Sequence, residues 1–337
     1  MNNDNSVTIQ TIAKKAHVSH TTVSRALNGS DLVKPETRRL IHQIADELGY
    51  VPNYNARSLV TKHSNMVGIF FTNLETGTSA SFLTEVITQV QEKLPPQYAV
   101  AINSISAAEA GPQISLQNYD GVIIISQSDS DKNFIQSITK KNIPAVVLNR
   151  NIQSDQINNY SINDFLGSKI ATQYAIRMGH RRFALIEGVE EFTSSQERSR
   201  GFKEALKEAG IPIETAIIQR GDYRPQSGNE IMRKILSSGE NPTCVICEND
   251  DMATGAISAC AELSYKVSED ISIIGFDDMP YSQYLTPPLT TVRKPTDEII
   301  ESGVNRLIKL MKGNHSNIQK QVYNPEIIVR SSVKRLN

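Results

Sequence analysis

From Asn65 onward, apolar runs that do not alternate with polar residues are separated by longer segments of helical periodicity. The strand candidates are Met66 to Phe71, Ala99 to Asn103, Gly121 to Ser126, Ala145 to Asn149, Phe183 to Glu187, Thr243 to Cys247 and Ile271 to Phe276. The helix candidates are Ser81 to Leu94, Lys132 to Lys140, Asp164 to Met178, Ser199 to Ala209, Gln226 to Leu236, Asp251 to Leu263 and Pro295 to Met311. Strands that are apolar throughout are typical of parallel sheets covered on both faces. Two successive blocks of this pattern predict an α/β core of two doubly wound subdomains.

Polar residues directly follow several of the expected strands. They are Thr72-Asn73, Asn149-Arg150, Asn249-Asp250 and Asp277-Asp278. Doubly wound sheets bind ligands beyond the carboxyl ends of their strands. These residues therefore predict a ligand pocket between the two subdomains.

The first sixty residues have a different pattern. Ile9, Ile12, Ala13 and Ala16 have the spacing of one helix face, and Val18-Ser19 leads into a second short helix with an apolar edge. A third helical segment starts at Pro35 and stops at Gly49. Such a pattern predicts a helix-turn-helix, although a small helical unit that merely packs, with a solvated polar face, would look similar.

On the second helix, the polar side chains fall opposite its apolar edge. His20, Thr21, Ser24 and Arg25 lie on the side away from Val23, Ala26 and Leu27. Side chains that hydrogen-bond from an exposed helix face can contact base edges in a major groove. The N-terminal region is therefore expected to bind DNA.

At these residues the chain resembles the LacI/GalR family of bacterial transcription regulators, named after the lactose and galactose repressors. The matching residues are Thr8-Ile9, Ile12-Ala13, Ala16, Val18-Ser19, Thr22-Val23-Ser24-Arg25, Leu27-Asn28, Val33, Thr37-Arg38, Leu48-Gly49-Tyr50, Pro52-Asn53, Ala56 and Leu59. The resemblance implies that His20, Thr21 and Arg25 contact bases, with Arg25 suited to a guanine. It implies that Thr8, Ser19, Thr22 and Asn28 contact phosphates and set the register.

The same resemblance places Ala56 and Leu59 among the DNA contacts, in a hinge helix that folds on the operator. The leucine would enter the minor groove at a central base step together with that of the dimer mate. An apolar wedge of this kind kinks a flexible step.

The resemblance extends through the core, which is similar to the periplasmic sugar-binding proteins. The matching motifs are Gly179-His180-Arg181-Arg182, Arg198-x-x-Gly201-Phe202, Gly221-Asp222-Tyr223 with Ser227-Gly228, Asn249-Asp250-x-Met252-Ala253 and Gly275-Phe276-Asp277-Asp278. Carried over by position, Arg198, Asn249 and Asp277 would hydrogen-bond ligand hydroxyls. Tyr223 would lay its ring against the ligand, and Thr72 and Asn149 would line the opposite wall. A guanidinium or carboxylate can engage two vicinal hydroxyls, which suits a sugar.

Structural roles remain open for several of these residues. Asp277 could cap a following helix, Asn249 could hold a turn, and Tyr223 could belong to the core. The family often has Asp where Asn149 stands, so the donor and acceptor pattern or the charge of the ligand could differ here. The segment from Ser104 to Tyr119 looks short and broken where relatives carry a full helix. Gly77-Thr78-Ser79 could donate to a ligand or simply start a helix.

The expected organisation has four parts. Residues 1–50 form the helix-turn-helix domain and residues 51–63 the hinge. Residues 64–160 with 292–322 form the core N-subdomain, and residues 161–291 with 323–337 the C-subdomain. Because operators of such proteins are two-fold symmetric, the working unit is expected to be a homodimer.

The net charge of −1 is unevenly distributed, because residues 1–63 carry +3 and the remainder −4. The attraction for phosphate therefore lies at the N-terminus. No long apolar run or leader is evident, and a cytoplasmic protein without membrane contact is expected. Cys244 and Cys247 form a Cys-x-x-Cys but lack a second pair at zinc spacing, so buried thiols are favoured over a metal or redox site, and no metal or cofactor is expected.

Together these observations predict a transcriptional repressor whose operator affinity is controlled by a small effector, preferably an inducing sugar. A corepressor-responsive or phosphoprotein-responsive regulator of the same fold is the alternative. A sugar-binding transport component would share the core but would lack the first sixty residues. An enzyme using Asp277 and Asp278 or His180 is conceivable, but no phosphate loop, His-Glu-x-x-His or nucleophile elbow supports it.

Overall fold

The computed structural model of the chain describes residues 7–27, 30–50, 64–75, 77–110, 114–115 and 118–336. The expected hinge at residues 51–63 lies outside these ranges. The contacts divide the chain into two compact units, residues 1–64 and 65–337.

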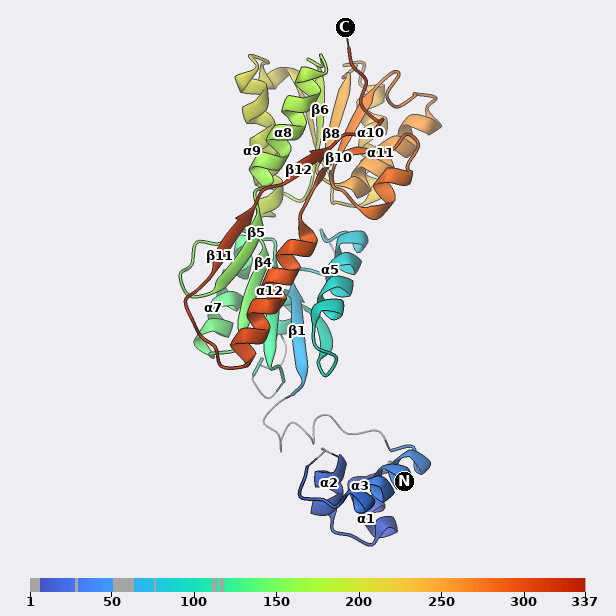
Figure 1. Ribbon diagram of the computed structural model, residues 1–337. Helices are drawn as coiled ribbons and strands as arrows, with labels where there is room; N and C mark the ends of the chain where they lie inside the picture. Colours follow the sequence, from blue (N-terminus) through green and yellow to red (C-terminus); the bar gives the residue numbers. More distant parts are fainter. Residues whose placement is uncertain are drawn as a thin grey trace. The chain divides into compact units, whose positions relative to one another are not determined.

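Among its described residues, the first unit contains three helices, α1 (Ile9–Ala16), α2 (His20–Leu27) and α3 (Pro35–Glu47) (Figure 1). Their apolar faces meet in one core, which includes Ile12, Val23, Ala26 and Ile41, all fully buried. Burying an Ile or Val side chain fully, rather than leaving it exposed, stabilises the fold by about 1.5–3 kcal/mol. The chain turns sharply after α1 because His17 adopts a left-handed backbone, with a φ of 51°, and ends the helix.

In the described part of the second unit there are two six-stranded sheets, each with helices on both faces (Figure 1). The sheet of the N-subdomain has the order β11-β5-β4-β3-β1-β2 and is parallel throughout. Its strands are β1 (Met66–Phe71), β2 (Ala99–Ser104), β3 (Gly121–Ser126), β4 (Ala145–Asn149), β5 (Asn158–Ile162) and β11 (Lys320–Tyr323). Its helices are α5 (Ala80–Lys93), α6 (Ile105–Ala110), the 3₁₀ helix η1 (Asp129–Asp131), α7 (Lys132–Lys140) and α12 (Thr296–Met311).

The sheet of the C-subdomain has the order β12-β10-β9-β8-β6-β7, and β12 alone among its described strands runs antiparallel to its neighbour. Its strands are β6 (Phe183–Glu187), β7 (Ile217–Arg220), β8 (Cys244–Cys247), β9 (Ser272–Asp277), β10 (Thr290–Arg293) and β12 (Glu326–Ile328). Its helices are α8 (Asp164–Arg177), α9 (Thr193–Glu208), α10 (Pro225–Ser237), α11 (Asp250–Glu262) and the 3₁₀ helices η2 (Ile213–Thr215) and η3 (Pro280–Tyr284).

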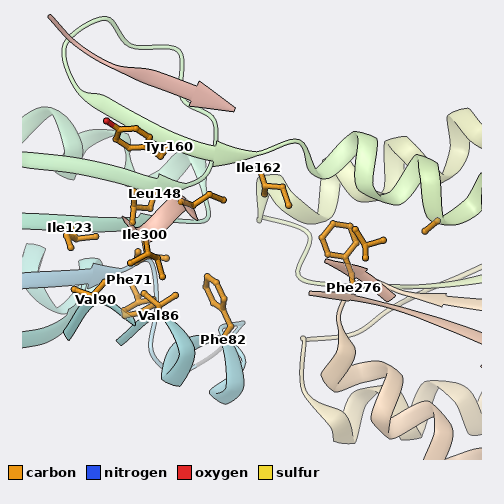
Figure 2. Packing of buried hydrophobic residues seen from close by; sticks show 14 of the residues in the cluster. Phe71, Phe82, Val86, Val90, Ile123, Leu148, Tyr160, Ile162, Phe276 and Ile300 are labelled. Atoms are coloured by element: carbon orange, nitrogen blue, oxygen red, sulfur yellow. The ribbon is translucent and has the colours of Figure 1, made fainter. Parts of the chain in front are cut away.

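Successive strand residues point to opposite faces, so each continuous apolar strand serves two cores. Ile69 and Phe71 of β1 pack toward α5 and α12, whereas Phe70 packs against Phe134 of α7. The cluster around Phe71 continues into the C-subdomain through Ile162 and Phe276, as Figure 2 shows. The two subdomains therefore share part of one apolar cluster.

Three segments connect the subdomains. The chain passes from β5 to α8 at Asn163, from β10 to α12 at residues 294–295, and from β11 to β12 at residues 324–325. The strands end directly before these segments, β5 at Ile162, β10 at Arg293 and β11 at Tyr323.

The predicted α/β class with an N-terminal helix-turn-helix is confirmed, and the seven expected strands begin and end within one residue of their predicted bounds. One helix boundary was wrong: α9 begins at Thr193, six residues before the predicted start at Ser199. Its first residues are Ser and Thr, so apolar periodicity could not mark its beginning. Strands β5, β7, β10, β11 and β12 were not predicted as strands, because they are short and mix polar with apolar residues.

Candidate functional site

A narrow cavity of about 30 Å³ is formed where the carboxyl ends of strands from both sheets meet. The lining residues are Gly77, Ser79, Phe82, Gln127, Asn149, Ser194, Arg198, Tyr223, Asn249, Asp277 and Lys294. Five of the six residues expected to contact a ligand are among them, and Thr72 is the exception.

Arg198 on α9 is held by several partners. Its Nε donates to Asp164 Oδ1 at 2.8 Å, and its Nη1 donates to the backbone carbonyl of Glu248. The guanidinium lies over the ring of Phe276, 3.7 Å from the ring centroid. Because the side chain is almost fully buried, these contacts are needed to offset its desolvation, and they fix the plane of the guanidinium beside the cavity.

The carboxyl group of Asp277 lies between two cations. Its Oδ1 is 3.9 Å from Nη2 of Arg198 and 3.7 Å from Nζ of Lys294. Burial raises the pKa of Asp277, and the two cations oppose that shift. The 3₁₀ helix that follows has Met279 at its N-cap and no side-chain cap bond, so no such bond ties Asp277 to a capping role.

Asn249 and Tyr223 each combine a structural contact with a place at the cavity. Asn249 caps α11, because its Oδ1 accepts from the backbone N–H of Met252 at 2.8 Å, and its Nδ2 donates to the carbonyl of Tyr223 at 2.9 Å. The Tyr223 ring stacks on Phe192 with centroids 6.1 Å apart and packs against Gly188. A Cβ at Gly188 would lie 2.0 Å from Tyr223 Cζ, so the ring requires glycine there.

On the opposite wall, the structure puts Gln127 where the sequence suggested Thr72. The Thr72 hydroxyl donates to Asp131 Oδ2 at 2.6 Å and accepts from the backbone N–H of Gln127 at 2.9 Å. The Thr72 hydroxyl is therefore engaged with the buried carboxylate of Asp131 and with the backbone of Gln127, and it helps to position the loop after β3. Asn149 does line the cavity and donates to the carbonyl of Ser126 at 3.2 Å.

Three residues of the cavity have unusual backbone conformations. Asn149, Tyr223 and Asp277 have φ values of 76°, 69° and 118°. Positive φ is uncommon for residues other than glycine, and it persists where surrounding contacts over-determine it, often at ligand sites. The backbone geometry therefore marks the same place as the side chains.

In the first unit, α2 exposes the side chains expected to contact bases. His20, Thr21 and Arg25 are exposed, whereas Val23 and Ala26 are buried against the other helices. The exposed face is polar and carries the positive charge of Arg25. It has the shape and chemistry of a helix that enters a major groove.

Of the residues expected to contact phosphates, Thr8, Ser19 and Thr22 lie at helix N-termini. Thr8 caps α1 through a reciprocal bond with Thr11, and Ser19 Oγ, just before α2, accepts from the backbone N–H of Thr22 at 3.1 Å. Helix N-termini attract phosphate groups. The other three expected DNA contacts, Asn28, Ala56 and Leu59, lie outside the described residues.

Comparisons with known proteins agree with this geometry. Residues 8–53 match the family described as bacterial regulatory proteins, lacI family, and residues 172–333 match the periplasmic binding protein-like domain. The chain is 43% identical over 330 residues to the protein named Probable HTH-type transcriptional repressor ExuR of Bacillus subtilis (strain 168), covering 98% of this chain and 99% of that relative. The chain belongs to the lacI family.

Two solved structures resemble this lacI-family protein over nearly its whole length. One is the lac repressor dimer bound to operator and the anti-inducer ONPF, with a TM-score of 0.79, 27% identity, and coverage of 98% of this chain and 100% of that one. The other is a complex of the transcriptional regulator CelR with cellobiose, with a TM-score of 0.69, 26% identity, and coverage of 97% and 99%. The predicted family is confirmed, and this lacI-family protein is a DNA-binding transcriptional repressor rather than an enzyme.

Six lining residues of this lacI-family protein were not predicted as ligand contacts. Gly77 and Ser79 are two of them; the sequence left them open between a ligand contact and a helix start, and Ser79 does cap α5. The other four are Gln127, Ser194, Lys294 and Phe82. Gln127 follows β3 directly, so the strand-end rule applied to that strand would have found it. Ser194 was missed because α9 begins earlier than predicted, and Lys294 was missed because β10, which it follows, was not predicted as a strand. Phe82 lies on a helix, where no strand-end signal exists.

Other features of this lacI-family protein have structural explanations. Cys244, Cys247 and Cys260 are free thiols buried in the C-subdomain, and burial raises the pKa of each. Among the described residues, no cluster of His, Cys, Asp and Glu could hold a metal ion. None of the helices within the described ranges is long and apolar enough to cross a membrane.

Proposed function

We propose that a sugar bound in the cavity between the subdomains controls the affinity of this repressor for a palindromic operator, and that the sugar acts as an inducer. The observation that carries the proposal is the cavity itself, whose polar side chains come from both subdomains. Gln127 and Asn149 contribute side-chain amides from the N-subdomain. From the C-subdomain, Arg198 contributes a guanidinium and Asp277 a carboxylate. Such groups suit vicinal hydroxyls.

Two related solved structures support this assignment. The related CelR was solved with cellobiose, and the related lac repressor was solved as a dimer on operator DNA. We propose that this chain likewise works as a homodimer in the cytoplasm, where its operator is. In this proposal residues 1–50 bind DNA and residues 51–63 form the hinge, with His20, Thr21 and Arg25 contacting bases and Thr8, Ser19, Thr22, Asn28, Ala56 and Leu59 completing the contact.

The coupling requires a ligand that contacts the two subdomains differently in two arrangements. A ligand shifts an equilibrium only by its difference in affinity for the two states. Coupling energies of about 1–3 kcal/mol, or roughly 5–150-fold in affinity, are typical and act in both directions. The operator must therefore weaken effector binding by the same factor by which the effector weakens operator binding.

The test is operator binding by the full-length chain, measured by fluorescence anisotropy on a palindromic duplex with a central CG step, with and without a panel of sugars and purines. Induction predicts that a sugar weakens binding at least fivefold. A compound that tightens binding instead would make the chain a corepressor-responsive regulator. Asp277→Ala is expected to retain operator binding and lose the response, whereas Ser258→Ala, an exposed position on α11, should retain both. Equal binding to all duplexes at low salt would contradict the proposal.

A further inference from the structure

A second cavity lies at the other end of the N-subdomain, where β4 and β5 begin and α12 ends (Figure 1). This amino-end cavity has a volume of about 180 Å³, well above the roughly 10–15 Å³ that one water molecule requires. Asn142, Gln156, Arg306, His315 and Ser316 are the polar residues of its lining that matter here. None of the described residues that line it is acidic, so the cavity contains a cation without a matching carboxylate.

Arg306 of α12 is 2% exposed and donates only to neutral groups in the described part of the chain. Its Nε donates to Asn158 Oδ1 at 2.8 Å, and its Nη1 donates to Ser316 Oγ at 2.9 Å. Its Nη2 donates to the backbone carbonyls of Ser316 at 2.6 Å and Asn317 at 3.1 Å. These bonds hold the loop before β11 against α12. They satisfy donors but leave the charge uncompensated, and a buried charge is costly unless it is paired.

The cavity also contains hydrogen-bond donors that are available to a ligand. An arginine side chain has five N–H donors, and the four bonds of Arg306 leave the second N–H of Nη1 without an acceptor among the described residues. The exposed side chains of Asn142, Gln156 and His315 line the same cavity, and they make no hydrogen bond to another described residue. A ligand with several acceptor oxygens would therefore find several donors.

Lysines make the surroundings of the amino-end cavity positive. Lys140, Lys141, Lys309 and Lys312 are exposed and lie within two positions of lining residues. Helices α7 and α12 end here, and each C-terminus carries only about half a negative charge. The acidic residue nearest to the lining in the sequence, Asp155, is paired with a lysine of β11 at 2.6 Å. The local charge is therefore positive, although residues 64–337 together carry −4.

We infer that the amino-end cavity binds the phosphate group of a small phosphorylated molecule, at a site separate from the cavity between the subdomains. A phosphate group carries about −1.5 to −2 charges at neutral pH and has three strong acceptor oxygens. Its charge compensates the buried guanidinium of Arg306, and its oxygens accept from Nη1 and from the side chains of Gln156 and His315. A carboxylate has one charge and two oxygens for the same donors. The inference does not depend on the sugar proposed for the other cavity.

The experiment is thermal unfolding of the full-length chain at pH 7 with inorganic phosphate, combined with ³¹P line broadening, and with sodium chloride at matched ionic strength as the reference. A dissociation constant of about 1 mM predicts that 10 mM phosphate raises the melting temperature by about 3–6 °C, whereas chloride should not raise it. Glycerol 3-phosphate should bind at least as tightly as phosphate, and glycerol should not bind.

Two kinds of variant locate the site. His315→Ala and Gln156→Ala leave the four bonds of Arg306 in place, and each should weaken phosphate binding at least threefold. Arg306→Gln should abolish binding, and circular dichroism shows whether that variant is folded. Lys294→Gln, in the cavity between the subdomains, and Lys169→Gln, in a surface pair with Glu208, should leave phosphate binding unchanged.

Several outcomes would overturn the inference. They are no binding at 10 mM phosphate, unchanged binding in both His315→Ala and Gln156→Ala, weaker binding of glycerol 3-phosphate than of phosphate, and loss of binding in Lys294→Gln, which would place the anion in the other cavity. The operator backbone is the other source of phosphate groups. If free phosphate does not bind and His315→Ala instead lowers the salt dependence of operator affinity by about one ion, DNA occupies the site and the small molecule is ruled out.

Discussion

Replacing Arg198 by alanine is expected to destabilise the C-subdomain strongly, because Asp164 would stay buried without its partner. The side chains of Arg198 and Asp164 are 5% and 10% exposed, and their hydrogen bond is 2.8 Å long. Removing one partner of a buried pair costs about 3–5 kcal/mol, since the remaining charge is uncompensated. At about 2–4 °C per kcal/mol for domains of 150–250 residues, the melting temperature should fall on the order of 10 °C.

The double variant Arg198→Ala/Asp164→Asn distinguishes the energy of the Arg198–Asp164 interaction from the other contacts of the two side chains. It leaves no unpaired carboxylate at position 164, so its cost should be smaller than the sum of the two single costs by about 0.5–3 kcal/mol. The measurement is urea unfolding of the full-length chain at pH 7 without ligand, followed by circular dichroism. Lys169→Ala breaks a surface pair between Lys169 of α8 and Glu208 of α9, and it should cost no more than about 1 kcal/mol. A cost below 1 kcal/mol for Arg198→Ala, or strict additivity, would refute the reasoning.

Three further predictions concern specificity, pH and the thiols. Arg25→Ala should remove about 1–3 kcal/mol of the preference for the operator over a random duplex. Arg39→Ala, which replaces an exposed arginine on α3, should leave that preference intact. Competition between the two duplexes, followed by fluorescence anisotropy, measures the preference of each variant. Burial raises the pKa of Glu248 from 4.5 to about 8, so between these pH values the folded state holds a proton that the unfolded chain releases. The free energy of unfolding should therefore fall as the pH rises from about 4.5 to 8. Glu248→Gln should flatten that slope, and Glu214→Gln, at an exposed site, should not. The three buried thiols should resist a disulfide reagent in the native state and all react in denaturant, and rapid native labelling of any one would contradict the burial.

The sequence predicted the parts of the fold that depend on local pattern. Continuous apolar runs such as Gly121–Ser126 become buried central strands, because a strand covered on both faces needs apolar residues at every position. Four-residue strands such as β7 (Ile217–Arg220), whose last two residues are exposed, carry too little pattern to be recognised. Their pairing is decided by the neighbouring strand, which the local sequence does not contain.

The cavity was predictable as far as the carboxyl ends of recognised strands mark it. Asn149 and Asp277 end such strands, Asn249 lies just after one, and all three line the cavity. Thr72 also follows one, yet its hydroxyl turns to Asp131, 59 residues away along the chain. A contact of that separation depends on the register between two strands and on the loop after β3, so no local pattern announces it.

The two subdomains touch through a few polar contacts beside the cavity. Ser81 Oγ on α5 donates to Asp251 on α11, and the backbone N–H of Thr193 donates to the carbonyl of Gln127 at 2.9 Å. These contacts exist only while the subdomains are close, so each favours the arrangement in which both walls reach the effector. Neither Ser81 nor Asp251 lines the cavity. A variant that breaks their bond therefore changes the arrangement without removing a ligand contact.

Ser81→Ala tests this coupling. A hydrogen bond to a charged group is worth about 1.5–3 kcal/mol when buried, and this one is partly exposed, so a loss of about 1 kcal/mol is expected. Asp251 keeps its bond from the Tyr281 hydroxyl at 2.6 Å and is not left unpaired. Effector affinity, measured by calorimetry, should fall about fivefold, and by reciprocity the effector-free repressor should shift its operator affinity in the direction opposite to that caused by the effector. Ser258→Ala removes a serine hydroxyl that bonds within α11 and should change neither affinity. Unchanged effector binding in Ser81→Ala would mean that closure of the subdomains is not what the effector selects.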